Sequence, residues 1–132
     1  MKLLKKLLAF LTAGTLLCSC SLLSSTEITG HSEIYSETDL QAAASAVENE
    51  FKHMKAGTLH HLNYAGDAAC ADTRSLNEEY RKKYTAYIIF DSSFTTPPEP
   101  FDAFEPNTEY TWNWVVARDW FGFWKVVDFG YC

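Results

Sequence analysis

The sequence predicts an α+β fold in which a curved antiparallel sheet of about four strands packs against an amino-terminal helix and a second, shorter helix. Two patterns support this prediction. Apolar residues recur at spacings of three and four over residues 37–55, as they do on one face of a helix. Residues 109–118 and 123–129 follow the two-residue period of strands instead. The 132 residues are enough for one domain at most, once any targeting segment is removed.

The first 20 residues have the three parts of a secretory signal peptide. Lys2, Lys5 and Lys6 precede an apolar run over residues 7–17, and small residues and cysteines follow it. The run is shorter than the ~20 apolar residues that a membrane-spanning helix needs. A buried helix of the domain is the alternative, but the order basic, apolar, small is the one that export machinery recognises. We therefore expect residues 1–19 to be a signal peptide.

The junction Leu17-Cys18-Ser19-Cys20 resembles the lipobox of bacterial lipoproteins. The resemblance implies that the Cys20 thiol receives a diacylglyceryl group and that cleavage leaves Cys20 as the first residue. Cys18 is the poorer candidate, because Leu17 would then stand directly before the cysteine, where a small residue is needed. Two acyl chains hold a soluble domain on a bilayer. The expected location is the outer face of the bacterial cytoplasmic membrane, and simple secretion is the alternative.

The rest of the chain divides into a tether and a domain. Residues 20–35 are polar, rich in Ser and Thr and without hydrophobic periodicity, which predicts a flexible tether. The domain covers residues 36–132. It begins with Ser36, a suitable cap for the helix over residues 37–55, and Gly57 is placed to end that helix.

Local composition predicts the remaining elements. Helix formers are frequent in residues 74–83, whereas all four prolines gather between residues 95 and 108. Strict alternation along the last strand puts Phe129 on the face opposite Trp124. The expected order is strand 58–64, loop 65–73, helix 74–83, strand 84–94, exposed loop 95–108, and strands 109–118 and 123–129 joined by the turn 119–122.

The balance of charge excludes one class of partner. Eleven basic residues oppose 17 acidic ones, which gives a net charge of −6. Cleavage of the signal peptide removes Lys2, Lys5 and Lys6 and leaves 8 basic and 17 acidic residues, a net charge of −9. A surface this acidic repels nucleic acid and anionic lipid, so binding of DNA or RNA is excluded.

Histidines and cysteines form no strong site motif. His60 and His61 lie in a predicted strand, where neighbouring side chains point to opposite faces, so they cannot share one ion. We expect neither a metal nor a cofactor. Cys70 and Cys132 are the thiols left once Cys20 is lipidated, and they form a disulfide or stay as two free thiols. Cys70 as a catalytic nucleophile would need a histidine within reach.

Aromatic residues are concentrated near the carboxyl end of the chain. Trp112 and Trp114 are expected in the core beneath the helix, because aromatic side chains dominate core packing. Trp120 and Phe121 lie in the predicted turn, where burial is not automatic. These two side chains form the candidate surface for a ligand or a partner.

The amino-terminal helix and the segments 112–118 (WNWVVAR) and 124–130 (WKVVDFG) resemble those of small uncharacterised lipoproteins of Gram-positive bacteria. The resemblance covers about residues 36–131, and its motifs are packing motifs. It implies a cone-shaped sheet of the nuclear-transport-factor-2-like or cystatin-like type. Enzymes of this fold class place acids and bases inside the cavity of the sheet.

Three functions stay open. The first is a non-enzymatic lipoprotein that binds a peptide, glycan or protein, which predicts an exposed apolar patch near Trp120 and Phe121 or on the proline-rich loop. The second is a small ketosteroid-isomerase-like enzyme with an apolar pocket between helix and sheet. Its candidate catalytic residues, by analogy of fold, are Asp128, then Tyr87 and Asp91. The third is a cystatin-like inhibitor or immunity protein that uses a protruding loop as a wedge.

Overall fold

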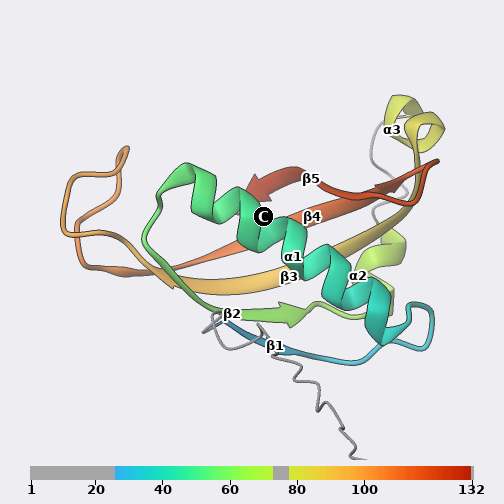
Figure 1. Cartoon of the computed structure of the whole chain (residues 1–132), viewed down its shortest axis with the longest axis horizontal. Helices are drawn as coiled ribbons and strands as arrows, with labels where there is room; N and C mark the ends of the chain where they lie inside the picture. Colours follow the sequence, from blue (N-terminus) through green and yellow to red (C-terminus); the bar gives the residue numbers. More distant parts are fainter. Residues whose placement is uncertain (1–25, 73–77, 132) are drawn as a thin grey trace, which may run out of the picture.

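The computed structural model describes residues 26–72 and 78–131. Five strands form one open, mixed sheet, and a long helix lies across one face of it (Figure 1). The elements are β1 Glu27–Thr29, α1 Glu37–Met54, β2 Thr58–Tyr64, α2 Asp67–Asp72, α3 Glu78–Lys83, β3 Tyr84–Thr95, β4 Glu109–Asp119 and β5 Trp124–Gly130. The strands follow one another in the sheet in chain order, β1 parallel to β2 and each later pair antiparallel. The predicted α+β fold is confirmed, with one strand more than expected.

The additional strand is β1, which lies in the segment expected to be a flexible tether. Its three residues pair in parallel with residues 61–63 of β2, and Ile28 packs against the core. Parallel neighbours need a long crossover connection, and α1 supplies it. The structure therefore differs from the expected tether over residues 26–35, because backbone pairing orders a segment that lacks a hydrophobic pattern. Residues 20–25 of the expected tether lie outside the described residues.

Helix α1 begins and ends with local signals. The hydroxyl of Ser36 accepts a hydrogen bond from the backbone N–H of Asp39 at 3.1 Å, as the sequence predicted for its cap. The helix ends at Met54, and the residue that caps it is Lys55, which has the left-handed conformation (φ 58°), and not Gly57. Gly57 serves another purpose, because a Cβ atom there would collide with the carbonyl oxygen of Thr95. The face of α1 toward the sheet consists of Leu40, Ala43, Ala44, Val47 and Phe51.

Aromatic side chains fill the space between α1 and the sheet. Phe51 of α1 lies 5.3 Å from the ring of Phe94 and 6.3 Å from that of Trp114. Phe94 and Trp114 are fully buried. Phe101 and Phe104 of the proline-rich loop stack on one another and close the same core at its end. Packed side chains therefore occupy the described part of the space between α1 and the sheet, where the isomerase hypothesis expects an apolar pocket.

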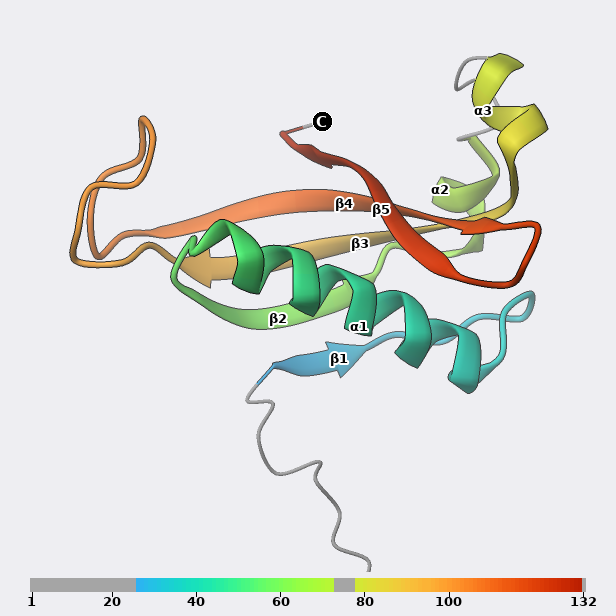
Figure 2. The same cartoon turned by 45° about the horizontal axis from the view of Figure 1, so that its top comes forward.

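Two further segments differ from the predicted elements. The expected loop 65–73 contains the short helix α2. Of the expected helix 74–83, residues 78–83 form α3. Residues 73–77 lie outside the described residues. Both helices lie at one end of the sheet, the end opposite the proline-rich loop (Figures 1 and 2).

A β-bulge in β5 makes the predicted orientation of Phe129 wrong. Val115 pairs with Asp128 and Val116 pairs with Val126, so Val127 is an extra residue in β5. The bulge turns Phe129 back to the core face, where its ring lies 5.2 Å from that of Trp114. Trp124 and Val126 pack against the same core. Strict alternation had placed Phe129 and Trp124 on opposite faces.

Candidate functional site

The turn between β4 and β5 presents three exposed aromatic side chains. Trp120, Phe121 and Phe123 are 71%, 87% and 66% exposed, and we call them the aromatic tip. The hairpin that carries them lies at the end of the molecule opposite the proline-rich loop (Figures 1 and 2). Trp120 and Phe121 are the two residues that the sequence singled out as a candidate surface.

Asp119 organises the aromatic tip. Its Oδ1 accepts hydrogen bonds from the backbone N–H groups of Phe121 at 2.9 Å and Phe123 at 3.0 Å. Its Oδ2 lies 3.2 Å from Nζ of Lys125. The hydrogen bond from Phe123 and the contact with Lys125 hold the pKa of the Asp119 carboxyl below its ordinary value. The Asp119 side chain therefore fixes the backbone of the turn, while the three aromatic rings stay exposed to solvent.

Helix α3 lies against the aromatic tip. The indole N–H of Trp120 donates a hydrogen bond to the carbonyl oxygen of Lys82 at 3.2 Å. The last turn of α3 carries the exposed cations Arg81, Lys82 and Lys83, while the acidic residues of this helix stand in its first turn. A single indole contact thus joins the aromatic tip to three consecutive positive charges.

The proline-rich loop and the last turn of α3 carry opposite charges. The proline-rich loop and its junction with β4 carry the acidic residues Glu99, Asp102, Glu105 and Glu109. This loop lies at the end opposite α3 and the aromatic tip (Figure 2). The chain is acidic overall, but its cationic α3 segment is separated from its acidic loop by the length of the sheet.

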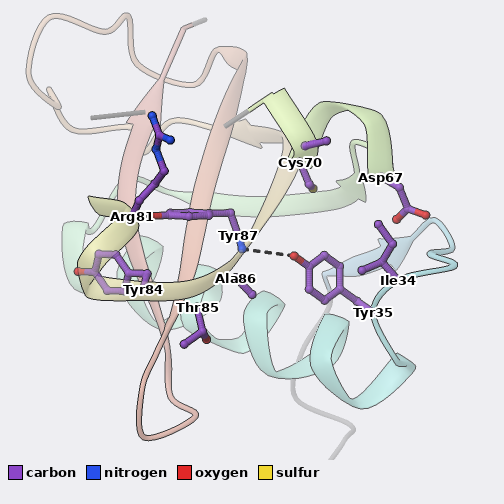
Figure 3. Close-up of a pocket in the computed structure, with 10 residues that line it drawn as sticks. Ile34, Tyr35, Asp67, Cys70, Arg81, Tyr84, Thr85, Ala86 and Tyr87 are labelled. Atoms are coloured by element: carbon purple, nitrogen blue, oxygen red, sulfur yellow. Dashed lines mark hydrogen bonds between the residues drawn. The ribbon is translucent and has the colours of Figure 1, made fainter. Parts of the chain in front are cut away.

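A cavity of about 340 Å³ opens next to α3. It lies where the segment before α1, α2, α3 and the start of β3 meet (Figure 3). The hydroxyl of Tyr35 accepts a hydrogen bond from the backbone N–H of Tyr87 at 3.3 Å across this cavity. The lining residues are Ile34, Tyr35, Asp67, Cys70, Ala71, Arg81, Tyr84, Thr85, Ala86 and Tyr87.

Asp67 is one of the polar residues that line this cavity. Its Oδ1 accepts hydrogen bonds from the hydroxyls of Ser32 at 2.5 Å and Tyr64 at 2.6 Å. Its Oδ2 accepts one from the backbone N–H of Glu33 at 3.0 Å. The hydrogen bonds from Ser32 and Tyr64 lower the pKa of the Asp67 carboxyl, whereas burial raises the pKa of the Tyr64 hydroxyl. The network fastens the segment before α1 to β2 and α2.

Cys70 is buried beside this network. Its Sγ accepts a hydrogen bond from the backbone N–H of Ile89 at 3.3 Å. Burial raises the pKa of the Cys70 thiol, so the thiol stays protonated near neutral pH and is a poor nucleophile. Cys132, its candidate disulfide partner, lies outside the described residues, and the pairing stays a prediction.

The histidines have separate partners. Nε2 of His60 lies 2.8 Å from the hydroxyl of Thr95, and Nδ1 of His61 lies 3.3 Å from the carboxylate of Glu27. Over residues 26–72 and 78–131, no three side chains of His, Cys, Asp or Glu gather in a way that would hold a metal ion.

The three candidate catalytic residues lie on the sheet face away from α1. Tyr87 is buried there with Val115 and Ala117, whereas Asp91 and Asp128 are exposed. Tyr87 and Asp91 are four residues apart on one strand, a separation of about 13 Å. The structure therefore does not bring the three together in one site, and none of them points into the core between α1 and the sheet.

Several parts of the site carried no signal in the sequence. Ser32 lies in a segment of tether-like composition, and the contact between Trp120 and Lys82 joins residues 38 positions apart. The sequence predicts that Asp119 lies in a turn, but nothing in it indicates the hydrogen bonds of its side chain to the turn backbone.

No helix among the described residues is both long enough and apolar enough to cross a bilayer. Comparisons with protein-family models, curated proteins and solved structures find no match for this chain.

Proposed function

We propose that the chain is a membrane-anchored, extracytoplasmic binding module whose contact surface is the aromatic tip. The observation that carries the proposal is the exposure of Trp120, Phe121 and Phe123 in one turn. Large exposed apolar surfaces mark interaction sites, and Trp and aromatic side chains contribute much of the binding energy at interfaces. Because Asp119 holds the turn, little conformational freedom is lost when a partner binds.

The lipid anchor in this proposal is the diacylglyceryl group expected on Cys20. It rests on the basic, apolar and small regions of the amino terminus and on the likeness of residues 17–20 to a lipobox. A tethered module needs only moderate affinity, because the anchor keeps the domain at a high effective concentration near the membrane.

A binding role is favoured over catalysis by the chemistry of the described residues. The space between α1 and the sheet is filled by aromatic rings. The Cys70 thiol has a raised pKa, and Tyr87, Asp91 and Asp128 are spread over the outer face of the sheet. The inhibitor hypothesis remains compatible with this proposal, since the protruding tip would then be the wedge.

The proposal is tested by asking whether the aromatic tip is covered in its native setting. Phe121→Cys is expressed in bacteria in a Cys132→Ser background and treated on intact cells with a membrane-impermeant maleimide. We expect slow labelling in cells and fast labelling of the same protein after purification in detergent.

Glu50→Cys on the exposed side of α1 is the matched control and should react rapidly in both settings. Equal, rapid labelling of Phe121→Cys in cells and in detergent would contradict a binding role for the tip.

A further inference from the structure

We propose that the partner of the aromatic tip is the anionic surface of the bilayer itself. This inference rests on the proposed function and names the surface that the tip contacts. The lipid anchor and the aromatic tip would then be two separate attachments to one membrane.

The composition of the tip suits the boundary between lipid headgroups and acyl chains. Trp side chains are enriched at this boundary because an apolar ring can enter it while the indole N–H keeps a polar partner. In Trp120 that partner is the carbonyl oxygen of Lys82, which satisfies the N–H while the ring stays 71% exposed. Phe121 and Phe123 add two apolar rings, and Gly122 between them adds no side chain.

The cations of α3 lie where they would meet lipid phosphates. Arg81, Lys82 and Lys83 are consecutive, exposed and joined to the tip through the hydrogen bond between Trp120 and Lys82. Nζ of Lys83 lies 5.8 Å from the centroid of the Tyr84 ring, and its side chain stays exposed. Lys125 and Arg118 also lie near the tip and form ion pairs with Asp119 and Asp39, respectively. Basic residues beside inserted aromatic rings are the usual composition of a segment that binds an anionic membrane surface.

The position of the acidic proline-rich loop favours one orientation. The net charge of the mature chain suggests repulsion from anionic lipid, but the acidic proline-rich loop lies at the end opposite α3 (Figure 2). With the aromatic tip toward the bilayer, this loop points away from it, and screening over about 10 Å removes most of its repulsion. The sheet register places Glu27 level with Thr111, about 26 Å along β4 from Asp119 at the base of the tip. The chain from Cys20 to Glu27 spans up to ~25 Å when extended, so the tip and the lipid anchor reach one membrane only with this segment extended.

The experiment uses the intact lipidated protein in phosphatidylglycerol vesicles with either brominated or ordinary acyl chains, because bromine quenches tryptophan only on contact. The contribution of Trp120 is the difference in emission between the native protein and Trp120→Phe. We expect brominated chains to remove most of this contribution.

Charge variants give the decisive comparison. Lys82→Glu with Lys83→Glu replaces two attractive charges by two repulsive ones, and we expect contact of the tip with lipid to fall by about tenfold or more. Lys52→Glu with Lys55→Glu makes the same change in charge at the carboxyl end of α1 and should leave the quenching of Trp120 intact. All four lysines are exposed, and thermal unfolding of each variant checks that the fold is retained.

The outcomes separate this inference from the proposed function. Equal emission of Trp120 in brominated and ordinary vesicles would overturn the inference, as would equal effects of the two charge variants. If Phe121→Cys is nevertheless protected on cells, the tip binds a macromolecule and the proposed function stands. If Phe121→Cys is labelled freely on cells, both proposals fail.

Discussion

Two buried tryptophans of β4 differ in one hydrogen bond. Nε1 of Trp114 donates to the hydroxyl of Ser92 at 2.9 Å, and that hydroxyl in turn donates to the carbonyl oxygen of Trp112 at 2.8 Å. Nε1 of Trp112 is buried and has no acceptor among the described residues. A buried donor without an acceptor opposes folding, so the indole of Trp112 contributes through its ring alone.

We therefore predict that the two tryptophans tolerate truncation differently. Trp114→Phe loses ring volume and a buried hydrogen bond, and we expect it to lower the free energy of unfolding by about 2 kcal/mol. Trp112→Phe removes an unsatisfied N–H along with the volume and should cost ~1 kcal/mol less. Urea unfolding of both variants measures the difference, and an equal or larger cost at Trp112 would contradict this account.

The carboxylate of Asp67 predicts an acid-sensitive part of the stability. Its pKa is lower in the folded protein than in the unfolded chain, because Ser32, Tyr64 and Glu33 donate hydrogen bonds to the ionised form. The stabilisation is therefore present above the unfolded pKa of about 3.9 and is lost as the pH falls through the lower folded-state value.

Asp67→Asn keeps an acceptor oxygen but not the charge. We expect its melting temperature to lie below that of the native protein near neutral pH and to approach it as the pH falls below about 4. Asp91→Asn, at an exposed position of β3, is the control and should follow the native protein throughout. A difference at Asp67 that does not narrow in acid would show that packing, not ionisation, is responsible.

The close approach of the start of β2 to the end of β3 depends on Gly57. The residue has φ +114°, and a Cβ atom would press on the carbonyl oxygen of Thr95. Gly66 has a similar φ of +103°, but no atom lies within 4 Å of the place that a Cβ atom would occupy there. A side chain at either position would therefore strain the backbone, but only a side chain at position 57 would also collide with Thr95.

Alanine substitution separates these two effects. We expect Gly57→Ala to lower the free energy of unfolding by more than about 2 kcal/mol, and Gly66→Ala to cost ~1 kcal/mol through strain alone. Chemical denaturation of the two variants is the measurement. Comparable costs at both positions would mean that β3 moves aside without penalty.

Elements with long periodic patterns were predictable from the sequence, and short ones were not. Helix α1 and strands β2, β3 and β4 follow the expected ranges within one residue or two, because each buries a repeated apolar face. Strand β1 has three residues and α2 has six, too few to show a period. The bulge at Val127 is set by the pairing of β5 with β4, which residue order along one strand does not reveal.

The candidate site was predictable to the same limited extent. Turn residues around Gly122 made it clear that Trp120 and Phe121 stand outside the regular strands. Their joining to α3 depends on a contact across 38 positions, and the cavity depends on Tyr35 meeting Tyr87 across 52. Such contacts follow from the topology of the sheet and have no local signature.

For the whole molecule, the expected anchor determines its mass. Protein extracted from a bacterial membrane fraction should have the intact mass of residues 20–132 plus a diacylglyceryl group. An unlipidated mass would contradict the membrane-anchored module. The same measurement with reductant addresses the candidate bond between Cys70 and Cys132, because reduction adds two hydrogen masses if the bond exists.

The two edges of the open sheet determine whether neighbouring copies of the chain can pair through their strands. A strand edge that is long and flat invites pairing with another copy of the chain. Here one edge is β1, which offers only three residues, and the other is β5, which is bulged at Val127 and carries Lys125. Both edges are therefore poor templates for strand addition. Molecules concentrated side by side on a membrane would stay separate, each free to present its own hairpin.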